Sequence, residues 1–250
     1  MGMTWVLLRG LGRESGHWGP FLPALRVAAT GCEVVTLDLP GTGTRLHDTA
    51  PGTMGETVDR VREEASSRDL LRAPLLLFGI SFGGMVAMEW ANSHPEELSG
   101  VVIAASSAPD LAPLLKRFSL AGFGVLVLNL LTRDPKRRHR RIAWLASNRR
   151  EIRDRIVREW MQIERDRPVS RPTIRAQTDA ALRWKAPASL HVPSLFLVAR
   201  KDRLVHPDCS RALARRFAAP LEEHPLAGHD LTTDAPEWVA DQCVRWAARL

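Results

Sequence analysis

Cysteine is scarce in this sequence. The 250 residues include only Cys32, Cys209 and Cys243. Their odd number argues against a disulfide framework and their spacing matches no metal-binding pattern, so we expect free thiols in a reducing compartment. No other cluster of metal ligands is visible in the sequence, and we therefore predict a protein that uses no metal.

Long apolar runs are also lacking. The longest, FSLAGFGVLVLNLL at 118–131, is shorter than the roughly 18 residues that a membrane-spanning helix needs. The chain begins MGMTWVLLRG, which enters a strand-like run at once without the basic-then-apolar organisation of a secretory signal. We therefore predict a cytoplasmic protein with no membrane span.

Acidic residues are few in the middle of the chain. Residues 110–185 contain 19 lysines and arginines against 8 acidic residues, whereas the remainder contains 16 against 20. The net charge of +7 therefore arises from one segment. A segment of this kind is typical of a solvated basic surface, of a nucleic-acid site or of a docking face for an acidic protein.

Short apolar runs alternate with amphipathic helices in both outer parts of the chain. This rhythm is typical of an open, mostly parallel α/β sheet whose strands are covered on both faces. Residues 110–188 instead read as helix after helix, which predicts a helical cap inserted into an α/β core made of 1–109 and 189–250. The expected strands are 4–8, 33–38, 74–79, 100–106, 192–199 and 221–226, and the expected core helices are 52–67, 82–94, 209–218 and 234–249.

The stretch LLLFGISFGG at 75–84 places a serine between two glycines at the end of an apolar strand. Gly79-x-Ser81-x-Gly83 fits the nucleophile elbow, a strained strand-to-helix turn that exposes the serine hydroxyl. The helix that follows contributes the positive end of its dipole near Ser81, which favours a developing oxyanion there.

A serine hydroxyl needs a base, and the base needs an orienting acid. Asp202 follows the apolar run LFLVA, and His229 precedes the last helix, so both lie where strands of a parallel sheet end. Ser81, Asp202 and His229 also stand in the chain order of hydrolases built on this elbow. Asp110 stays open as a second candidate acid, and His224 is expected to be an ordinary surface residue.

These motifs resemble those of serine hydrolases with the α/β-hydrolase fold, over essentially the whole chain. The segments that carry the resemblance are LLRGLGRESGHW, TLDLPGTGT, GISFGG and the stretches around Asp202 and His229. The layout is similar to that of the short carboxylesterases, which include pimeloyl-acyl-carrier-protein methyl ester esterase. The resemblance implies a sheet of about six strands, since TWVLL corresponds to the family's third strand and the first two are missing.

The resemblance also implies a mechanism and a site. Ser81 would attack a carboxylic ester and form an acyl-enzyme, with His229 as base and Asp202 as its orienting acid, and no cofactor would be needed. The backbone N–H groups of Leu11 and Phe82 would hold the oxyanion. Arg9 stands where the family has histidine, which makes the geometry of that loop an open question. The substrates would be small-molecule esters, thioesters or acyl-carrier-bound esters, and the alternative is a non-catalytic ligand-binding member of the fold.

The basic cap gives two further expectations. Trp144 and Trp160 lie on apolar helical faces, which argues against nucleic acid and leaves a solvated surface or an acidic carrier protein steered by the basic charge. The apolar stretch 118–131 is expected either to line an acyl pocket or to pack on the body. The residues proposed to meet the carrier are Arg137, Arg138, Arg140 and Arg141.

Overall fold

The structure is a computed structural model that describes residues 3–250, apart from the side chains at 114, 115, 126 and 130. One parallel sheet of six strands runs through it in the order β2-β1-β3-β4-β5-β6. This confirms the predicted α/β-hydrolase architecture. The strands are β1 (Thr4–Leu8), β2 (Glu33–Leu37), β3 (Leu75–Ile80), β4 (Leu98–Ala104), β5 (Ser194–Ala199) and β6 (Leu221–His224).

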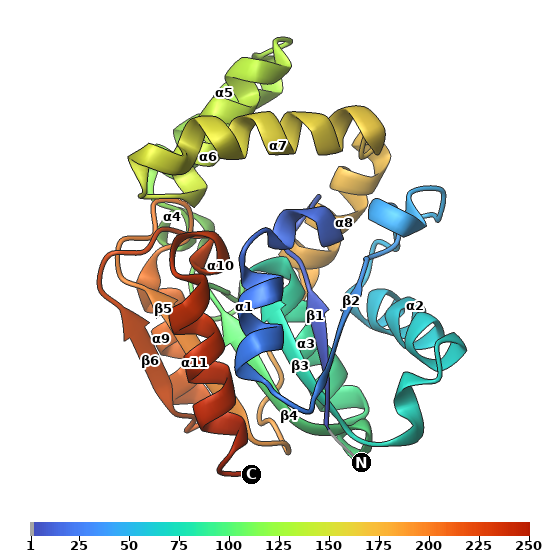
Figure 1. Ribbon diagram of the computed structural model, residues 1–250. Helices are drawn as coiled ribbons and strands as arrows, with labels where there is room; N and C mark the ends of the chain where they lie inside the picture. Colours follow the sequence, from blue (N-terminus) through green and yellow to red (C-terminus); the bar gives the residue numbers. More distant parts are fainter. Residues whose placement is uncertain (1–2) are drawn as a thin grey trace.

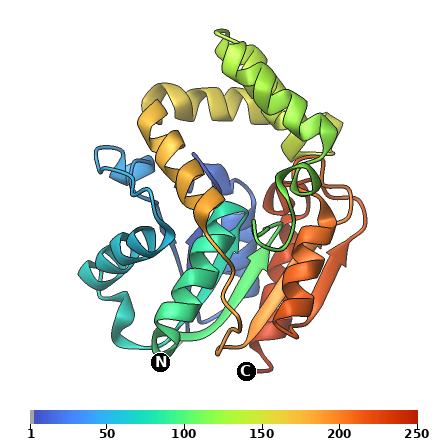
Figure 2. The same ribbon diagram turned by 180° about the vertical axis from the view of Figure 1, so that it is seen from behind.

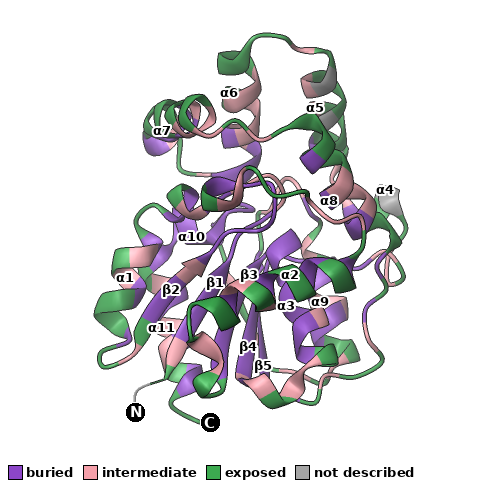
Figure 3. Cartoon of the chain, turned by 90° about the vertical axis from the view of Figure 1, so that its right-hand side faces the viewer, coloured by how far each residue is buried: buried purple, intermediate pink, exposed green. Residues whose placement is uncertain are grey.

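Helices cover both faces of the sheet, which is why the central strands are apolar nearly throughout. All six residues of β3 and all six of β5 are buried, and Figure 3 shows these strands enclosed by helices whose outer faces are exposed. Helices α1 (Phe21–Ala28) and α11 (Pro236–Ala247) pack in one apolar cluster. The other cluster holds α2 (Met54–Ser67), α3 (Phe82–Ser93) and α9 (Pro207–Arg216).

The long segment between β4 and β5 is helical, as predicted. Figures 1 and 2 show its helices above the edge of the sheet opposite both termini. Ile152, Ile156 and Trp160 recur at helical spacing and are buried in a separate small core, with Ile163 packed against it. The helices are α4 (Leu114–Arg117), α5 (Leu120–Leu131), α6 (Pro135–Ala146), α7 (Arg153–Asp166) and α8 (Arg171–Arg183). The exact limits of a cap domain, 110–188, stay a prediction.

The stretch 118–131 does not behave as expected from its hydropathy. Most of its described residues belong to α5, whose large apolar side chains include Leu120 at 88% exposed and Leu131 at 79%. These two side chains face solvent and are neither in a pocket nor packed on the body.

Among residues 3–250, no helix has both the length and the apolar character that crossing a bilayer would require.

Candidate active site

Ser81 occupies the turn between β3 and α3 in a backbone conformation that is rare for serine, with φ 56° and ψ −117°. Positions 79 and 83, on either side of this turn, have room only for glycine. A Cβ on Gly79 would overlap the Gly83 carbonyl group, and a Cβ on Gly83 would overlap the Leu8 carbonyl oxygen on β1. Strain of this kind persists only where the surroundings impose it, and it is concentrated at functional sites. The local geometry is that of a nucleophile elbow.

Strand β4 and the residues just after it support the turn. The Ser81 N–H donates to the Ala104 carbonyl oxygen at 2.9 Å, which continues the β3–β4 ladder. The buried Ser106 hydroxyl donates to the Ser81 carbonyl oxygen at 2.8 Å. Sequence reasoning missed Ser106, which stands just after β4 and carries no motif. Its contact fixes the backbone of Ser81 from the side of the sheet.

The loop after β1 passes directly beside Ser81. A Cβ on Gly10 would lie 3.4 Å from the Ser81 Cβ and 3.8 Å from its Oγ. Among the described residues, neither the Leu11 N–H nor the Phe82 N–H donates a hydrogen bond. Both N–H groups are therefore unpaired among the described residues, as the donors of an oxyanion hole must be, and their role stays a prediction.

Asp202 and His229 are brought together at the carboxyl ends of β5 and β6. The His229 Nδ1 lies 2.7 Å from the Asp202 Oδ2, and both side chains are at least nine-tenths buried. The Asp202 Oδ1 accepts the N–H groups of Leu204 at 2.8 Å and Val205 at 2.9 Å, which fix the orientation of the carboxylate. One carboxylate oxygen is therefore held by the backbone and the other by the imidazole.

The electrostatics of His229 suit a base. Burial lowers its pKa, but the Asp202 carboxylate outweighs burial through its charge and its hydrogen bond and holds that pKa above the ordinary value of 6.5. A hydrogen bond at Nδ1 leaves Nε2 as the nitrogen that can take a proton from a neighbouring hydroxyl. The arrangement can therefore support nucleophilic acyl transfer.

Arg9 makes a buried ion pair that ties this site together. Its guanidinium lies 2.6 Å from the Asp230 carboxylate, 2.9 Å from the Thr232 hydroxyl and over the Trp18 ring at 4.7 Å. Burial raises the pKa of Asp230, but the charge of Arg9 outweighs it and holds that pKa well below its usual range. Arg9 precedes Gly10 and Asp230 follows His229. The ion pair therefore joins the loop after β1 to the loop that carries His229.

We expect Arg9→Met to destabilise the fold by about 3–5 kcal/mol, because it leaves the Asp230 carboxylate buried and uncompensated. Urea unfolding monitored by tryptophan fluorescence measures this loss. Arg9→Met combined with Asp230→Leu should recover most of it, since the double variant buries no charge. Arg60→Met, at an exposed ion pair with Glu63, serves as the control and should change little. Equal stability of Arg9→Met and Arg60→Met would contradict the structural role of the pair.

The loop after β1 also contacts two of the cap helices. The Gly12 N–H donates to the Gln177 Oε1 on α8 at 2.8 Å, and the Arg13 guanidinium lies 3.8 Å from the centre of the Trp160 ring on α7. Burial, followed by the nearby charge of Arg9, lowers the pKa of Arg13 to about 10. These contacts couple the cap to the Leu11 backbone. No sequence motif signals them.

The other sequence candidates have structural partners of their own. Asp110 accepts the Ala186 N–H at 3.1 Å and lies 3.8 Å from Arg216, at the end of the helical segment. The His224 Nδ1 accepts the Ala227 N–H at 2.9 Å, and its ring packs against Trp238. Asp202 is therefore the acid that contacts His229, whereas Asp110 contacts Ala186 and Arg216.

The four arginines proposed for a carrier are not equivalent. Arg138 pairs with Glu164 at 2.7 Å, and Arg141 donates to the Thr132 hydroxyl at 2.6 Å, so both make contacts within the cap. Arg137 is 73% exposed on its side chain, and Arg140 is exposed. Of the four, Arg137 and Arg140 are therefore the two that carry outward charge.

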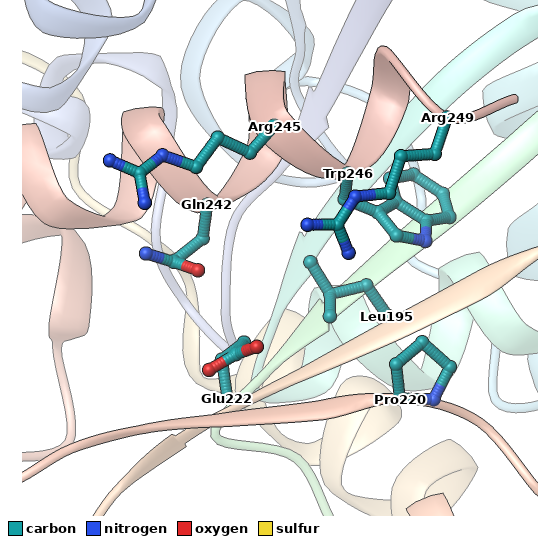
Figure 4. A pocket seen from close by; sticks show the side chains of 7 residues that line it. All are labelled: Leu195, Pro220, Glu222, Gln242, Arg245, Trp246 and Arg249. Carbon is teal, nitrogen blue, oxygen red and sulfur yellow. The ribbon is translucent and has the colours of Figure 1, made fainter.

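Two other features lie away from this edge of the sheet. A cavity of about 230 Å³ is lined by Glu222, Arg245 and Arg249, among other residues, and Figure 4 shows the side chains around it. Leu195 and Pro220 also line it, so it opens at the amino ends of β5 and β6.

Within residues 3–250, one group of side chains is close enough together to hold a cation. It consists of His94, Glu96 and Glu97, and Glu97 already pairs with Arg62.

Comparison with known proteins places the chain in a family. The model of the alpha/beta hydrolase family matches residues 5–242. The chain belongs to this family. The pimeloyl-[acyl-carrier protein] methyl ester esterase of Aeromonas hydrophila is 34% identical over 126 residues, 49% of this chain and 46% of that protein. The protein of the same name from Yersinia pseudotuberculosis is 34% identical over 122 residues, 47% of this chain and 43% of that protein. The chain thus spans about half the length of the curated relatives it matches.

Solved structures share the fold of this α/β hydrolase. A putative non-heme bromoperoxidase from Mycobacterium tuberculosis has a TM-score of 0.77 and 23% identity, over 100% of this chain and 93% of that one. An esterase from Rhodococcus has a TM-score of 0.78 and 18% identity, over 100% and 91%. At these identities the likeness shows the fold alone. The family model over residues 5–242 confirms the resemblance inferred from the motifs.

Proposed function

We propose that this α/β hydrolase is a serine carboxylesterase. The observation that carries the proposal is the 2.7 Å contact between His229 and Asp202 at the same sheet edge as the strained Ser81 turn. A buried imidazole with an orienting carboxylate, together with a partly exposed serine on an elbow, supports acyl transfer. The esterase names of the curated relatives support the same reaction.

The proposed reaction uses Ser81, His229 and Asp202 in the roles of a serine-hydrolase triad. Ser81 Oγ attacks the ester carbonyl carbon while His229 Nε2 takes its proton, and the N–H groups of Leu11 and Phe82 hold the oxyanion. The imidazolium, stabilised by Asp202, then gives the proton to the leaving alcohol. Water repeats the sequence on the acyl-enzyme and releases the acid. Each oxyanion donor is expected to contribute roughly 3 kcal/mol in the transition state.

The finer proposal is that the ester is presented on an acyl carrier protein. The names of the curated relatives motivate it, and the outward charge of Arg137 and Arg140 is complementary to an acidic carrier. Thioesters stay a second substrate class, because the same oxyanion hole serves both.

Hydrolysis of p-nitrophenyl esters of graded acyl length tests the proposal. We expect turnover with an initial burst of about one p-nitrophenol per chain when deacylation is slow. A serine-directed fluorophosphonate should add to the peptide that contains Ser81, as read by mass spectrometry. A folded protein that binds esters without turnover and without labelling would instead be a non-catalytic binding member of the family.

The pH profile of kcat/KM provides a second test. Only the neutral imidazole of His229 accepts the serine proton, and its pKa is raised above 6.5 in the folded protein. We therefore expect kcat/KM for a neutral ester to fall as pH drops, through an apparent pKa above 6.5. An acid limb well below 6.5 would contradict the assigned coupling between His229 and Asp202.

The carrier proposal is tested by reversing charge. Arg137→Glu with Arg140→Glu should lower the ratio of kcat/KM for carrier-bound over free ester by about tenfold, because steering speeds association. The wild-type ratio should also fall as salt rises past about 0.1 M, where screening acts over roughly 10 Å. Arg245→Glu with Arg249→Glu, at the other end of the sheet, is the matched control. Equal ratios in both variants would leave the arginines as a solvated surface.

A further inference from the structure

Helix α5 exposes a stripe of large apolar side chains. Leu120 is 88% exposed, Leu131 79%, Leu128 49%, Phe123 42% and Val127 42%. Four of these positions are separated by three or four residues, which places them along one side of the helix. No charged residue occurs between 118 and 131. The stripe is therefore apolar along its whole length.

This stripe is concentrated compared with the rest of the described surface. The other exposed large apolar side chains, such as Val27, Ile174 and Leu226, occur at most two to an element. Exposed apolar residues that occur singly need no explanation, whereas a contiguous patch marks a surface that contacts something else. Figure 3 shows α5 as a largely exposed helix that stands clear of the body.

The turn between α5 and α6 forms the apex of the molecule. Figures 1 and 2 both place it at the end opposite the two termini, with the cap helices and then the sheet behind it. Nothing among the described elements projects beyond this turn. A flat surface can therefore reach this turn and the Leu131 end of the stripe without meeting the body first.

Basic side chains follow the stripe directly. Residues 133–141 contain six lysines and arginines and one acidic residue, Asp134. The Asp134 carboxylate is occupied by the N–H groups of Lys136 and Arg137, which it caps. Arg133, Lys136 and Arg140 are exposed. The apex thus combines an apolar stripe with a cationic flank.

We propose that the α5–α6 turn binds the surface of an anionic phospholipid bilayer. The apolar stripe would enter the boundary between headgroups and acyl chains, and the flanking lysine and arginines would meet lipid phosphates. α5 has 12 residues, too few to span a bilayer. The proposal does not depend on the esterase activity or on the carrier.

A bilayer fits this surface better than a protein partner does. Protein interfaces carry about one hydrogen bond per 100–200 Å², but the exposed stripe presents only hydrocarbon. The nearby amide of Asn129 already accepts from Arg141 within the cap. Apolar residues on one face of a helix beside clustered lysines and arginines are the pattern of interfacial membrane helices.

Co-sedimentation of the full chain with vesicles tests the proposal. We expect binding to phosphatidylcholine vesicles that contain phosphatidylglycerol, much weaker binding to phosphatidylcholine alone, and weakening as salt rises past about 0.1 M. Phe123→Ser with Leu128→Ser and Leu131→Ser should weaken binding at least about tenfold. The control Val27→Ser with Leu226→Ser changes side chains that are 79% and 69% exposed elsewhere and should bind like wild type.

The flanking charges are tested separately. Arg133→Gln and Lys136→Gln should each weaken binding to the anionic vesicles about fivefold, the effect of one basic residue near such a surface. Circular dichroism of every variant verifies that the fold is kept. Three outcomes would overturn the proposal: no binding to anionic vesicles, equal binding by the apolar variant, or a concentration-dependent dimer or carrier complex that the apolar variant loses while vesicles stay unbound.

Discussion

Ser81→Ala is expected to lower kcat for p-nitrophenyl esters by roughly 10⁶-fold, the scale on which removal of a serine nucleophile acts. Alanine supplies no oxygen for the acyl-enzyme, while the oxyanion donors and the binding surface stay in place. The thermal transition should hardly move, because the Ser81 side chain makes no hydrogen bond among the described residues and alanine tolerates φ 56° about as well as serine does.

His229→Ala should show a loss of similar size, because the two residues act as one unit and their effects do not add. His224→Ala is the matched histidine control. Its imidazole contacts Ala227 and Trp238, so this variant should lose some stability and keep wild-type kcat. Ester turnover that survives Ser81→Ala would contradict the nucleophile assignment, and so would fluorophosphonate labelling of that variant.

Much of the fold can be predicted from this sequence, since the strands are buried on both faces. Such strands need continuous apolar runs, and each expected strand coincides with an observed one to within two residues. The elbow is visible for a related reason. The space around Ser81 admits only glycine at positions 79 and 83. A pattern of five residues is therefore enough to predict the turn.

Contacts between distant residues could not be predicted in the same way. Arg9 and Asp230 are 221 positions apart, and nothing local to Arg9 identifies its partner. The donation from Ser106 to the Ser81 backbone likewise depends on how β3 and β4 are paired. Local pattern specifies which elements form, whereas pairing of side chains depends on how the sheet and cap assemble.

The apolar stretch 118–131 shows a different limit. Hydropathy indicates that a segment avoids water, but it does not say which surface covers it. The structure turns Leu120 and Leu131 outward, so the expectation of a buried helix was wrong for these residues. Leu145 and Ala143, on the next helix of the same cap, are buried as their apolar character suggests.

Asp202→Asn is expected to lower kcat by up to about 10⁴-fold with little change in fold, because the asparagine selects the wrong imidazole tautomer. The N–H groups of Leu204 and Val205 require an acceptor at the Oδ1 position. The amide oxygen satisfies them, which turns the amide N–H₂ toward His229 Nδ1. The imidazole must then accept at Nδ1 and carry its proton on Nε2, where it cannot act as base for Ser81.

The pH profile of kcat/KM distinguishes the loss of the Asp202 carboxylate from a general disordering of the site. Without the carboxylate, burial is the largest remaining influence on His229 and lowers its pKa, so the acid limb of kcat/KM for Asp202→Asn should move to lower pH than in wild type. Asp110→Asn is the control, and its profile should match wild type because Asp110 contacts Ala186 and Arg216 instead. If Asp202→Asn were silent while Asp110→Asn lost turnover, the acid would be Asp110, and reaching His229 would require a rearrangement of the segment that Asp110 now holds.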